Sequence, residues 1–413
     1  MKSAFFDTFK PLAGGMRPLE IVEYLLLALM TVLLPYDWQL AMWLMPLLAV
    51  NTLCRIVAAR RVGNPGLTGA SRWALWLMVA FFVYQIVSML YTDNKEDGWE
   101  MIVRRLPLLV FALCALAADS TYLERRRLRL LLYAFTASLT VKFFVRFVIM
   151  LATQHKVFIC SLFDPLHHTY MAMYLMFALG FIYSEVVFHR SEMPCWFKWV
   201  LAVVAALLVT YTFFVNSRTG TAGLIALALA VVAHWMFRLK QWKRGFALLA
   251  VVLAVGTGIH FALPECARRL TQTISEMNEG DTSDARYLIF GSSMKAISEN
   301  GAFGVGLGDK NDVLDEVYEE TGNEHAVEAQ YNSHNIYLDS MLTMGVPGLV
   351  LLLALLGVPA FMAWRRRDFI AMSLLFSFAF SGLFEALLNR QMGIMFLGLF
   401  WLILMASEEK EKL

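Results

Sequence analysis

Long apolar runs separated by short polar connections recur along almost the whole chain. Each run is about 17–23 residues long, enough for a helix to cross the ~30 Å hydrocarbon core of a bilayer. Membrane barrel strands are about half this length, so we predict an all-α, polytopic integral membrane protein. Twelve spans are expected, at residues of about 18–35, 38–55, 72–91, 104–119, 129–150, 169–188, 198–216, 220–238, 245–263, 337–364, 369–387 and 392–407.

The stretch 264–336 interrupts this pattern and is the largest polar segment of the chain. Its own periodicity predicts a helix from Ser283 or Asp284 to about Glu299 and a second helix at about 312–320, as in a lid. Elsewhere the connections are short, so residues 1–413 are expected to form a single transmembrane helical domain. The lid would lie between spans nine and ten.

A third helix is expected to begin at His334, with Ser333 as its N-cap. Gly345 and Pro347 should break or kink this helix, because proline lacks a backbone donor and clashes with the preceding turn. The glycine-rich run 304–308 follows no predicted strand and opens no strong helix, so a nucleotide site there is rejected.

Composition and charge add an orientation to this outline. The chain is 59% hydrophobic and 16% charged, against about 25% charged in soluble proteins. With a cytoplasmic N-terminus, 22 of the 35 Lys and Arg fall on the inner side, as the positive-inside rule requires. Both termini are therefore expected in the cytoplasm and the lid outside, and no cleavable signal is expected.

The lid holds 14 Asp and Glu against 5 Lys and Arg, an asymmetry that the net charge of +2 conceals. Nothing in this distribution resembles a nucleic-acid surface. The five cysteines show no metal-binding spacing. Cys160 and Cys266 would both face the oxidising side and could pair there, although we favour unpaired thiols.

A candidate anion contact lies in the connection between spans seven and eight. Arg218 is held in this short turn at the outer boundary, among the polar side chains of Asn216, Ser217 and Thr219. A guanidinium offers a planar fork of donors that suits phosphate oxygens. The alternative is an interfacial arginine that binds lipid headgroups, but the tight polar turn favours a functional role.

Two further candidates lie on the lid. Arg286 is near the start of the first lid helix, where the helix macrodipole prefers an anion. It therefore either reaches an anion or pairs with Asp281 or Asp284. His334 lies at the outer boundary, and imidazole is the usual proton acceptor from a hydroxyl near neutral pH; the alternatives are a hydrogen-bonding role at a helix start, or His325 in its place.

The outer start of span six carries His167, His168 and Tyr170. Adjacent histidines point in different directions on a helix, so a shared metal ion is not expected. Hydrogen bonding to a substrate and anchoring at the membrane interface by Tyr170 are both reasonable roles.

Charges within or near the spans are also candidates. Lys142 and Arg146 share one face of span five, and such charges usually face a cavity or a partner. Glu385 is a possible partner for Lys142. Further candidate anion contacts at the outer mouth are Arg104, Arg105 and Arg390.

Three of these pieces together resemble the O-antigen ligase and polymerase family of bacterial envelope glycan assembly. They are Asn216-Ser-Arg-Thr-Gly220, Arg286 followed by a helix and the 304–308 turn, and Ser333-His-Asn-Ile-Tyr337 leading into 345–348. The resemblance covers residues 165–350 closely and the rest only as general architecture.

This resemblance implies a metal-independent, cofactor-free membrane glycosyltransferase in the bacterial inner membrane, with its active site facing the periplasm. The donor would be an undecaprenyl-diphosphate-linked glycan, and the acceptor a hydroxyl of lipid A–core oligosaccharide, with inversion at the anomeric carbon. Arg218 and Arg286 would clamp the diphosphate and His334 would be the general base. Expected substrate contacts are Asn216, Ser217, Thr219, Asn335, His167, Tyr170 and Arg146.

Two other functions are compatible with parts of this pattern. A polymerase would use the same donor but join lipid-linked repeats; twelve spans and a lid before span ten look more like the ligase. A flippase or other transporter would place functional charges near the midplane and contain paired broken helices. The candidates gather instead at one membrane face, which favours the enzyme.

Overall fold

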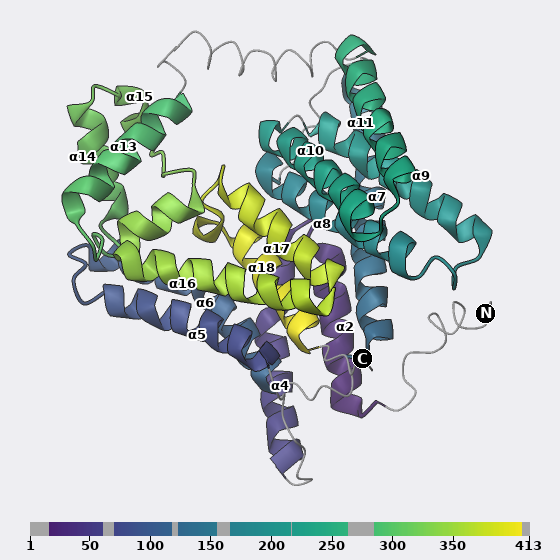
Figure 1. The fold of residues 1–413 in the computed structure, drawn as a ribbon. Helices are drawn as coiled ribbons and strands as arrows, with labels where there is room; N and C mark the ends of the chain where they lie inside the picture. The colour runs from purple at the N-terminus through teal and green to yellow at the C-terminus, as the bar shows by residue number, and fades with distance from the viewer. Residues whose placement is uncertain are drawn as a thin grey trace.

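The computed structural model describes residues 16–60, 70–117, 123–154, 166–215, 217–262 and 285–406. Every regular element in these ranges is helical, which confirms the all-α fold class (Figure 1). The helices at the predicted spans are α2 (Pro18–Leu33), α3 (Trp38–Trp43), α4 (Met45–Arg60), α5 (Ala70–Ser88), α6 (Lys95–Ala117), α7 (Arg125–Gln154), α8 (His168–Phe188), α9 (Cys195–Phe214), α10 (Arg218–Ala233) with the π-helical turn η1 (His234–Arg238), α11 (Trp242–Ala262), α16 (Ile336–Arg366), α17 (Phe369–Gly382) and α18 (Gln391–Ala406).

Each predicted span falls on a helix of this series, although the expected span 38–55 consists of two helices, α3 and α4. Not all of them have the length and hydropathy of a membrane crossing, so the expected number of twelve is not confirmed. Six described segments are long and apolar enough to cross: Trp38–Ala58, Arg125–Ala152, His168–Phe188, Cys195–Phe214, Arg218–Phe237 and Ile336–Arg366.

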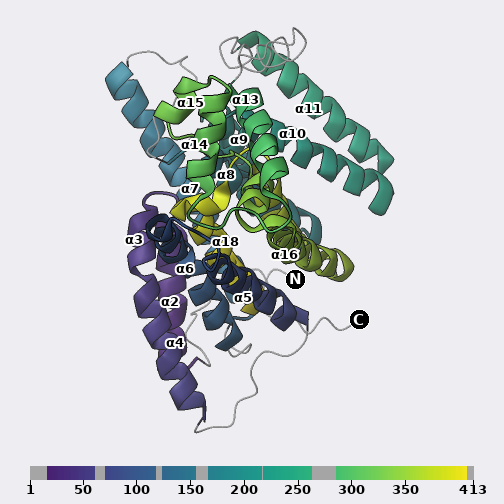
Figure 2. The same cartoon turned by 90° about the vertical axis from the view of Figure 1, so that its left-hand side faces the viewer.

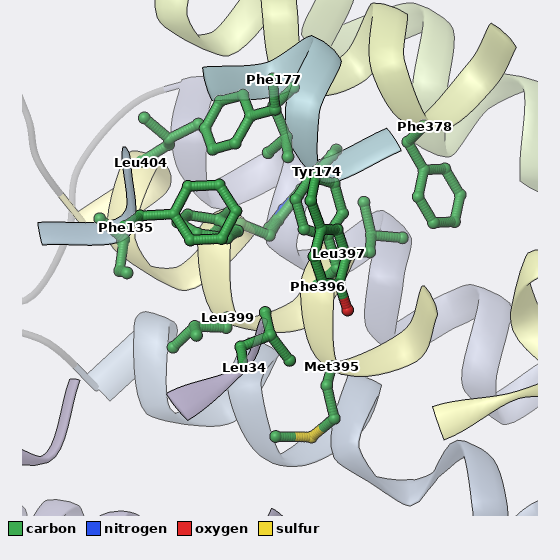
Figure 3. Packing of buried hydrophobic residues seen from close by; sticks show 14 of the residues in the cluster. Leu34, Phe135, Tyr174, Phe177, Phe378, Met395, Phe396, Leu397, Leu399 and Leu404 are labelled. Atoms are coloured by element: carbon green, nitrogen blue, oxygen red, sulfur yellow. The ribbon is translucent and has the colours of Figure 1, made fainter. Parts of the chain in front are cut away.

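Helices α8 and α18 form the centre of the bundle. Both are apolar nearly all round, as expected of helices that are surrounded by protein, and most of their side chains are buried. Aromatic rings fill the space between them (Figure 3): Tyr174 stacks on Phe396 at 4.8 Å, and Phe177 meets Phe400 edge-on at 4.8 Å. The ends of these central helices are therefore well-fixed positions from which side chains can project.

The described part of the lid contains α13 (Ala285–Asn300), α14 (Lys310–Glu320) and α15 (Glu324–Glu328), which gather beside the start of α16 (Figures 1 and 2). The two predicted lid helices are thus confirmed within two residues. The spacing of Tyr287, Phe290, Met294 and Ile297 predicts the apolar face of the first helix. This prediction is partly wrong, since Met294 is 55% exposed and Ile289 and Ala296 are buried. Ile289 and Ala296 belong to a small separate core that also contains Leu314, Val317, Tyr318, Ala326 and Leu342.

Helix α16 begins two residues later than predicted. Its N-cap is Asn335 rather than Ser333, because the Asn335 side chain accepts hydrogen bonds from the N–H groups of Tyr337 (2.8 Å) and Leu338 (3.1 Å). The predicted kink is confirmed: Gly345 has φ 64° and ψ −159°, far outside the helical region. Such a backbone strongly favours glycine.

The glycine-rich turn after α13 packs on this kink through backbone hydrogen bonds. The N–H groups of Val305 and Gly306 donate to the carbonyls of Leu342 (2.9 Å) and Thr343 (2.9 Å), and Val346 N–H donates to Ala302 O (2.7 Å). A Cβ atom at Gly345 would lie 2.0 Å from the carbonyl oxygen of Ala302. The glycines therefore attach the lid to α16.

Candidate functional site

His334 is held in a tight turn directly before α16. Its φ of 43° is left-handed, which is uncommon for a residue with a side chain. The side chain of Asn332 accepts a hydrogen bond from His334 N–H at 2.8 Å, and the Tyr331 ring meets the imidazole edge-on at 5.7 Å. The turn thus fixes the imidazole, which keeps 30% of its side-chain surface exposed.

Glu385 joins two of the predicted histidines. Its Oε1 lies 3.4 Å from His334 Nδ1, and its Oε2 lies 4.0 Å from His167 Nδ1. Glu385 is in the connection after α17, and its Oε1 also accepts the N–H of Ala386 at 3.1 Å. The sequence suggested this carboxylate as a possible partner for Lys142. That pairing is wrong, because Glu385 faces the histidines and Lys142 donates to the carbonyl of Pro35.

The surroundings of Glu385 favour its charged form. Burial raises the pKa of this carboxyl, but its hydrogen bond with His334 and the charges of His334 and His167 outweigh burial, and the pKa is lowered overall. An ionised Glu385 keeps the proton of a neutral His334 on Nδ1. The Nε2 atom of His334 is then left as a proton acceptor.

A polar cavity of about 380 Å³ adjoins the His334 turn, with Tyr331 and Asn332 in its lining. Its charged lining residues come from α6, α14 and the connection before α18: Asp97, Arg104, Lys310, Asp312, Asp315 and Arg390. Charges of both signs and side-chain amides line one space, so it suits a strongly polar molecule with many hydroxyls.

A buried ionic network lies beneath this cavity. Asp339 accepts hydrogen bonds from Lys310 Nζ (3.0 Å), from a terminal nitrogen of Arg105 (3.3 Å) and from Asn389 Nδ2 (2.8 Å). Burial lowers the pKa of Lys310 to about 8 against the attraction of Asp339, with Arg105 lowering it further. The expectation that Arg105 draws anions inward is wrong, because its side chain is 1% exposed and bound to this network.

The same network holds the connection that carries Glu385. Arg105 Nε donates to the carbonyl of Leu388 at 3.0 Å, and Asn389 Oδ1 accepts from Arg105 (2.7 Å) and Lys310 (2.8 Å). On the other side, Asn335 Nδ2 donates to the carbonyl of Leu383 at 3.1 Å. Helices α6, α14 and α16 therefore all fix the segment around Glu385.

Arg218 is the first residue of α10, directly after the short turn that follows α9. Ser217 caps this helix: its hydroxyl is buried and accepts the N–H of Gly220 at 3.1 Å. A Cβ atom at Gly220 would lie 2.8 Å from Cβ of Ala172. The first turn of α10 thus packs on the first turns of α8, at the end of the bundle that carries His167.

Two buried hydroxyls near these helix starts have no hydrogen-bond partner among the described residues, Tyr170 Oη and Thr219 Oγ1. The Tyr170 side chain is 1% exposed, and its ring lies 5.8 Å from that of His167. Buried hydroxyls are usually bonded, so both positions are unusual within the bundle.

The other predicted site residues are not brought into this arrangement. Arg146 lies on α7 and forms no ion pair with any described residue. Asn216, Cys160, Cys266 and residues 264–284 lie outside the described residues. Arg286 is in the first turn of α13, and its side chain is likewise outside the described part of the structure.

Sequence reasoning missed Asp339, Lys310 and Asn389 altogether. One signal was available: Asp339 is an acid in the first turn of a long apolar helix, and ionisable residues in such segments are functional or paired by default. Across the described residues, no group of three or more His, Cys, Asp or Glu side chains is arranged to hold a metal ion. Independence from metal stays a prediction.

Residues 200–353 match the family model described as O-antigen ligase. This segment is therefore similar to the O-antigen ligase domain of that family. It runs from within α9 into α16 and contains Arg218, Arg286 and His334, whereas Glu385 and His167 lie outside it. A search of curated proteins finds no match to the chain.

This match, to residues 200–353 of the 413-residue chain, supports the resemblance to the O-antigen ligase and polymerase family. The membrane-length helices agree with a membrane protein. Members of this family are membrane glycosyltransferase-like enzymes that act on lipid-linked glycans. The resemblance found in the sequence is thereby confirmed at the level of the family.

Proposed function

We propose that this protein is an O-antigen ligase of the bacterial inner membrane. It transfers a glycan from undecaprenyl diphosphate to a hydroxyl of lipid A–core oligosaccharide on the periplasmic face, with both termini in the cytoplasm. The observation that carries the proposal is the pair formed by His334 and Glu385, 3.4 Å apart at the edge of a polar cavity. This pair lies in a chain with an O-antigen ligase domain.

His334 is the proposed general base. Its Nε2 takes the proton of the acceptor hydroxyl while the hydroxyl oxygen forms a bond to the anomeric carbon of the donor. The bond between this carbon and the diphosphate oxygen breaks, and its electron pair leaves with the diphosphate. Glu385 stabilises the imidazolium that forms, as carboxylates do in other base–carboxylate pairs. Attack opposite the leaving group inverts the anomeric carbon.

Arg218 and Arg286 are the proposed contacts of the diphosphate. Negative charge collects on the leaving group as the anomeric bond breaks, and guanidiniums aimed at it stabilise the transition state. Arg218 is suited to this because its helix begins at the end of the bundle that carries His167. Asn216 and Thr219 flank it in the proposed donor site, whereas the Ser217 hydroxyl caps α10.

The acceptor sugar is proposed to enter the 380 Å³ cavity beside the His334 turn. The carboxylates and amides of its lining suit sugar hydroxyls, and Arg104 and Arg390 suit negatively charged substituents. His167 and Tyr170 contact the reacting groups from the other side of Glu385. Asn335 is a positioning residue, since its side-chain amide caps α16 and binds the carbonyl of Leu383.

The test uses purified protein in detergent with an undecaprenyl-diphosphate glycan, lipid A–core acceptor and EDTA. Wild type should transfer the glycan, and His334→Ala should be about 10²–10⁴-fold slower because the general base is lost. Arg218→Ala should also be severely impaired. His325→Ala is the matched control, because it removes an exposed lid histidine and should retain activity.

All four proteins must first show the same thermal unfolding, so that loss of activity is not loss of fold. Elongation of the lipid-linked glycan with the core left unmodified would identify a polymerase instead. Unchanged transfer by both His334→Ala and Arg218→Ala would overturn the proposed site. Loss of transfer on adding EDTA, restored by a divalent cation, would overturn independence from metal.

A further inference from the structure

A second cavity of about 380 Å³ lies where α7 and α17 begin and where α8 and α16 end. Helix α8 separates the two sites: His167 precedes its first residue, and His189 at the second cavity follows its last. Twenty-one helical residues span about 30 Å at 1.5 Å per residue. The second cavity therefore opens at the face of the bundle remote from His334.

This cavity has an excess of positive charge. Four arginines line it, Arg125, Arg129, Arg366 and Arg367, against the single carboxylate of Asp368. The charge of Arg129 is balanced by the buried carboxylate of Glu185, which it binds through two nitrogens at 2.8 and 2.5 Å.

The charges at the end of α16 are less balanced. Asp368 is engaged as the N-cap of α17, accepting the N–H of Ala371 at 3.0 Å. Arg366 and Arg367 are exposed and form no ion pair with any residue that the structure describes. The cavity therefore presents guanidiniums whose charge is not met by protein carboxylates.

The backbone supports an attractive role for these arginines. Helices α7 and α17 begin at this cavity and α8 and α16 end there, so the partial charges of the helix ends offset one another and the positive excess comes from the arginines. Arg367 ends α16 in the left-handed conformation, with φ 59° and ψ 30°. Glycine is the usual residue at such a helix end. An arginine in this conformation has a conformational cost, which ending the helix does not by itself explain.

One wall of the cavity is apolar. The rings of Phe188 and Phe369 lie 4.8 Å apart, and Phe188 is 42% exposed. On the adjoining surface of α16, Trp364 is 51% and Phe361 is 61% exposed, a pattern typical of side chains at a membrane interface. An occupant that combines a phosphate with an apolar chain would satisfy both the guanidiniums and this wall.

We propose that this cavity binds the headgroup of an anionic phospholipid from the leaflet remote from His334. The guanidiniums of Arg366 and Arg367 contact the phosphate oxygens, and the acyl chains run along Phe188 and the outer face of α16. Arginine suits phosphate through paired N–H donors, and basic pockets between membrane helices bind lipid headgroups. The inference is independent of the proposed glycan transfer.

The test measures lipid binding to the detergent-purified protein by native mass spectrometry, titrating phosphatidylglycerol and phosphatidylcholine. The cavity variant is Arg366→Gln with Arg367→Gly, since glycine keeps the left-handed backbone. Arg366→Gln alone is a second variant. The matched control is Arg190→Gln with Arg365→Gln, which removes two exposed arginines near the same helix ends that do not line the cavity.

Phosphatidylglycerol should bind wild type about 10-fold more tightly than phosphatidylcholine. The cavity variant should bind phosphatidylglycerol about 10- to 30-fold more weakly, as expected for the loss of two arginines, and the control should stay within about 2-fold. Equal weakening in cavity variant and control would show diffuse surface attraction and overturn the site. Displacement of the lipid by equimolar inorganic phosphate would show a free-phosphate site and overturn the lipid assignment.

Discussion

Two carboxylates at the same end of the bundle have opposite surroundings. Asp339 is 3% exposed and accepts hydrogen bonds from Arg105, Lys310 and Asn389, so its charge is fully matched inside the protein. Glu385 is also largely buried, but its side-chain partners are two partly exposed histidines, with His334 30% and His167 44% exposed.

The difference indicates that Asp339 supports the fold and that Glu385 takes part in proton transfer. A buried carboxylate that is bound by both an arginine and a lysine cannot lose its charge without a large loss of stability, because those cations would be left unmatched. A carboxylate that faces an exposed imidazole stabilises that imidazole in its protonated form and so assists proton transfer. Asn389 links the two regions. It belongs to the Asp339 network, and it lies in the same connection as Glu385. The network therefore positions the pair formed by Glu385 and His334.

The largest effect is expected from breaking the network. Asp339→Asn leaves Arg105 and Lys310 as buried cations without a carboxylate, which should lower the free energy of unfolding by about 3–5 kcal/mol. Thermal or denaturant unfolding in detergent measures this. Glu319→Gln, an exposed change on the same lid, should stay within about 0.5 kcal/mol. Wild-type stability in Asp339→Asn would show that the network does not support the fold.

An intermediate effect is expected at the reactive pair. Glu385→Gln keeps the shape of the side chain but removes the charge that stabilises a protonated His334, so glycan transfer should fall about 10- to 100-fold. The free energy of unfolding should change by only about 1–2 kcal/mol. Rates are measured on folded protein, with Glu299→Gln as an exposed control. A full rate in Glu385→Gln would remove this residue from the mechanism.

The smallest effect is a dependence of stability on pH. Since the pKa of Glu385 is lowered in the folded protein, its charge stabilises the fold above the usual carboxyl value near 4.5. This contribution is lost as the pH falls through the lowered value. The difference in unfolding free energy between wild type and Glu385→Gln, about 1–2 kcal/mol near neutral pH, should therefore shrink as the pH falls below about 4.5. A difference that does not change with pH would contradict the assignment.

Much of the fold could be predicted because its signals are local. Long apolar runs marked the helices, and Gly345 with Pro347 marked the kink in α16. The errors arose where neighbours decide the outcome. Asn335 caps α16 rather than Ser333, and Met294 faces outward because α14 packs on a different face of α13 than the apolar spacing indicated.

The site could be predicted only in part. His334 and His167 were found because a histidine beside an apolar run is visible in the sequence. Their connection through Glu385 was not, since Glu385 is 51 residues from His334 and more than 200 from His167. Arg105 was misread for the same reason: its partner Asp339 is 234 residues away. No local pattern encodes such pairings.

The attachment of the lid at Gly345 has a mechanical consequence. The first turns of α16 are held at one end by Asn335 and at the other by the backbone bonds of residues 302–306. Asp339 fixes the middle of this stretch to α6 and α14. The start of α16 is therefore held at three points. We expect a movement of the lid that admits a large glycan to occur away from this stretch, with His334 left in place.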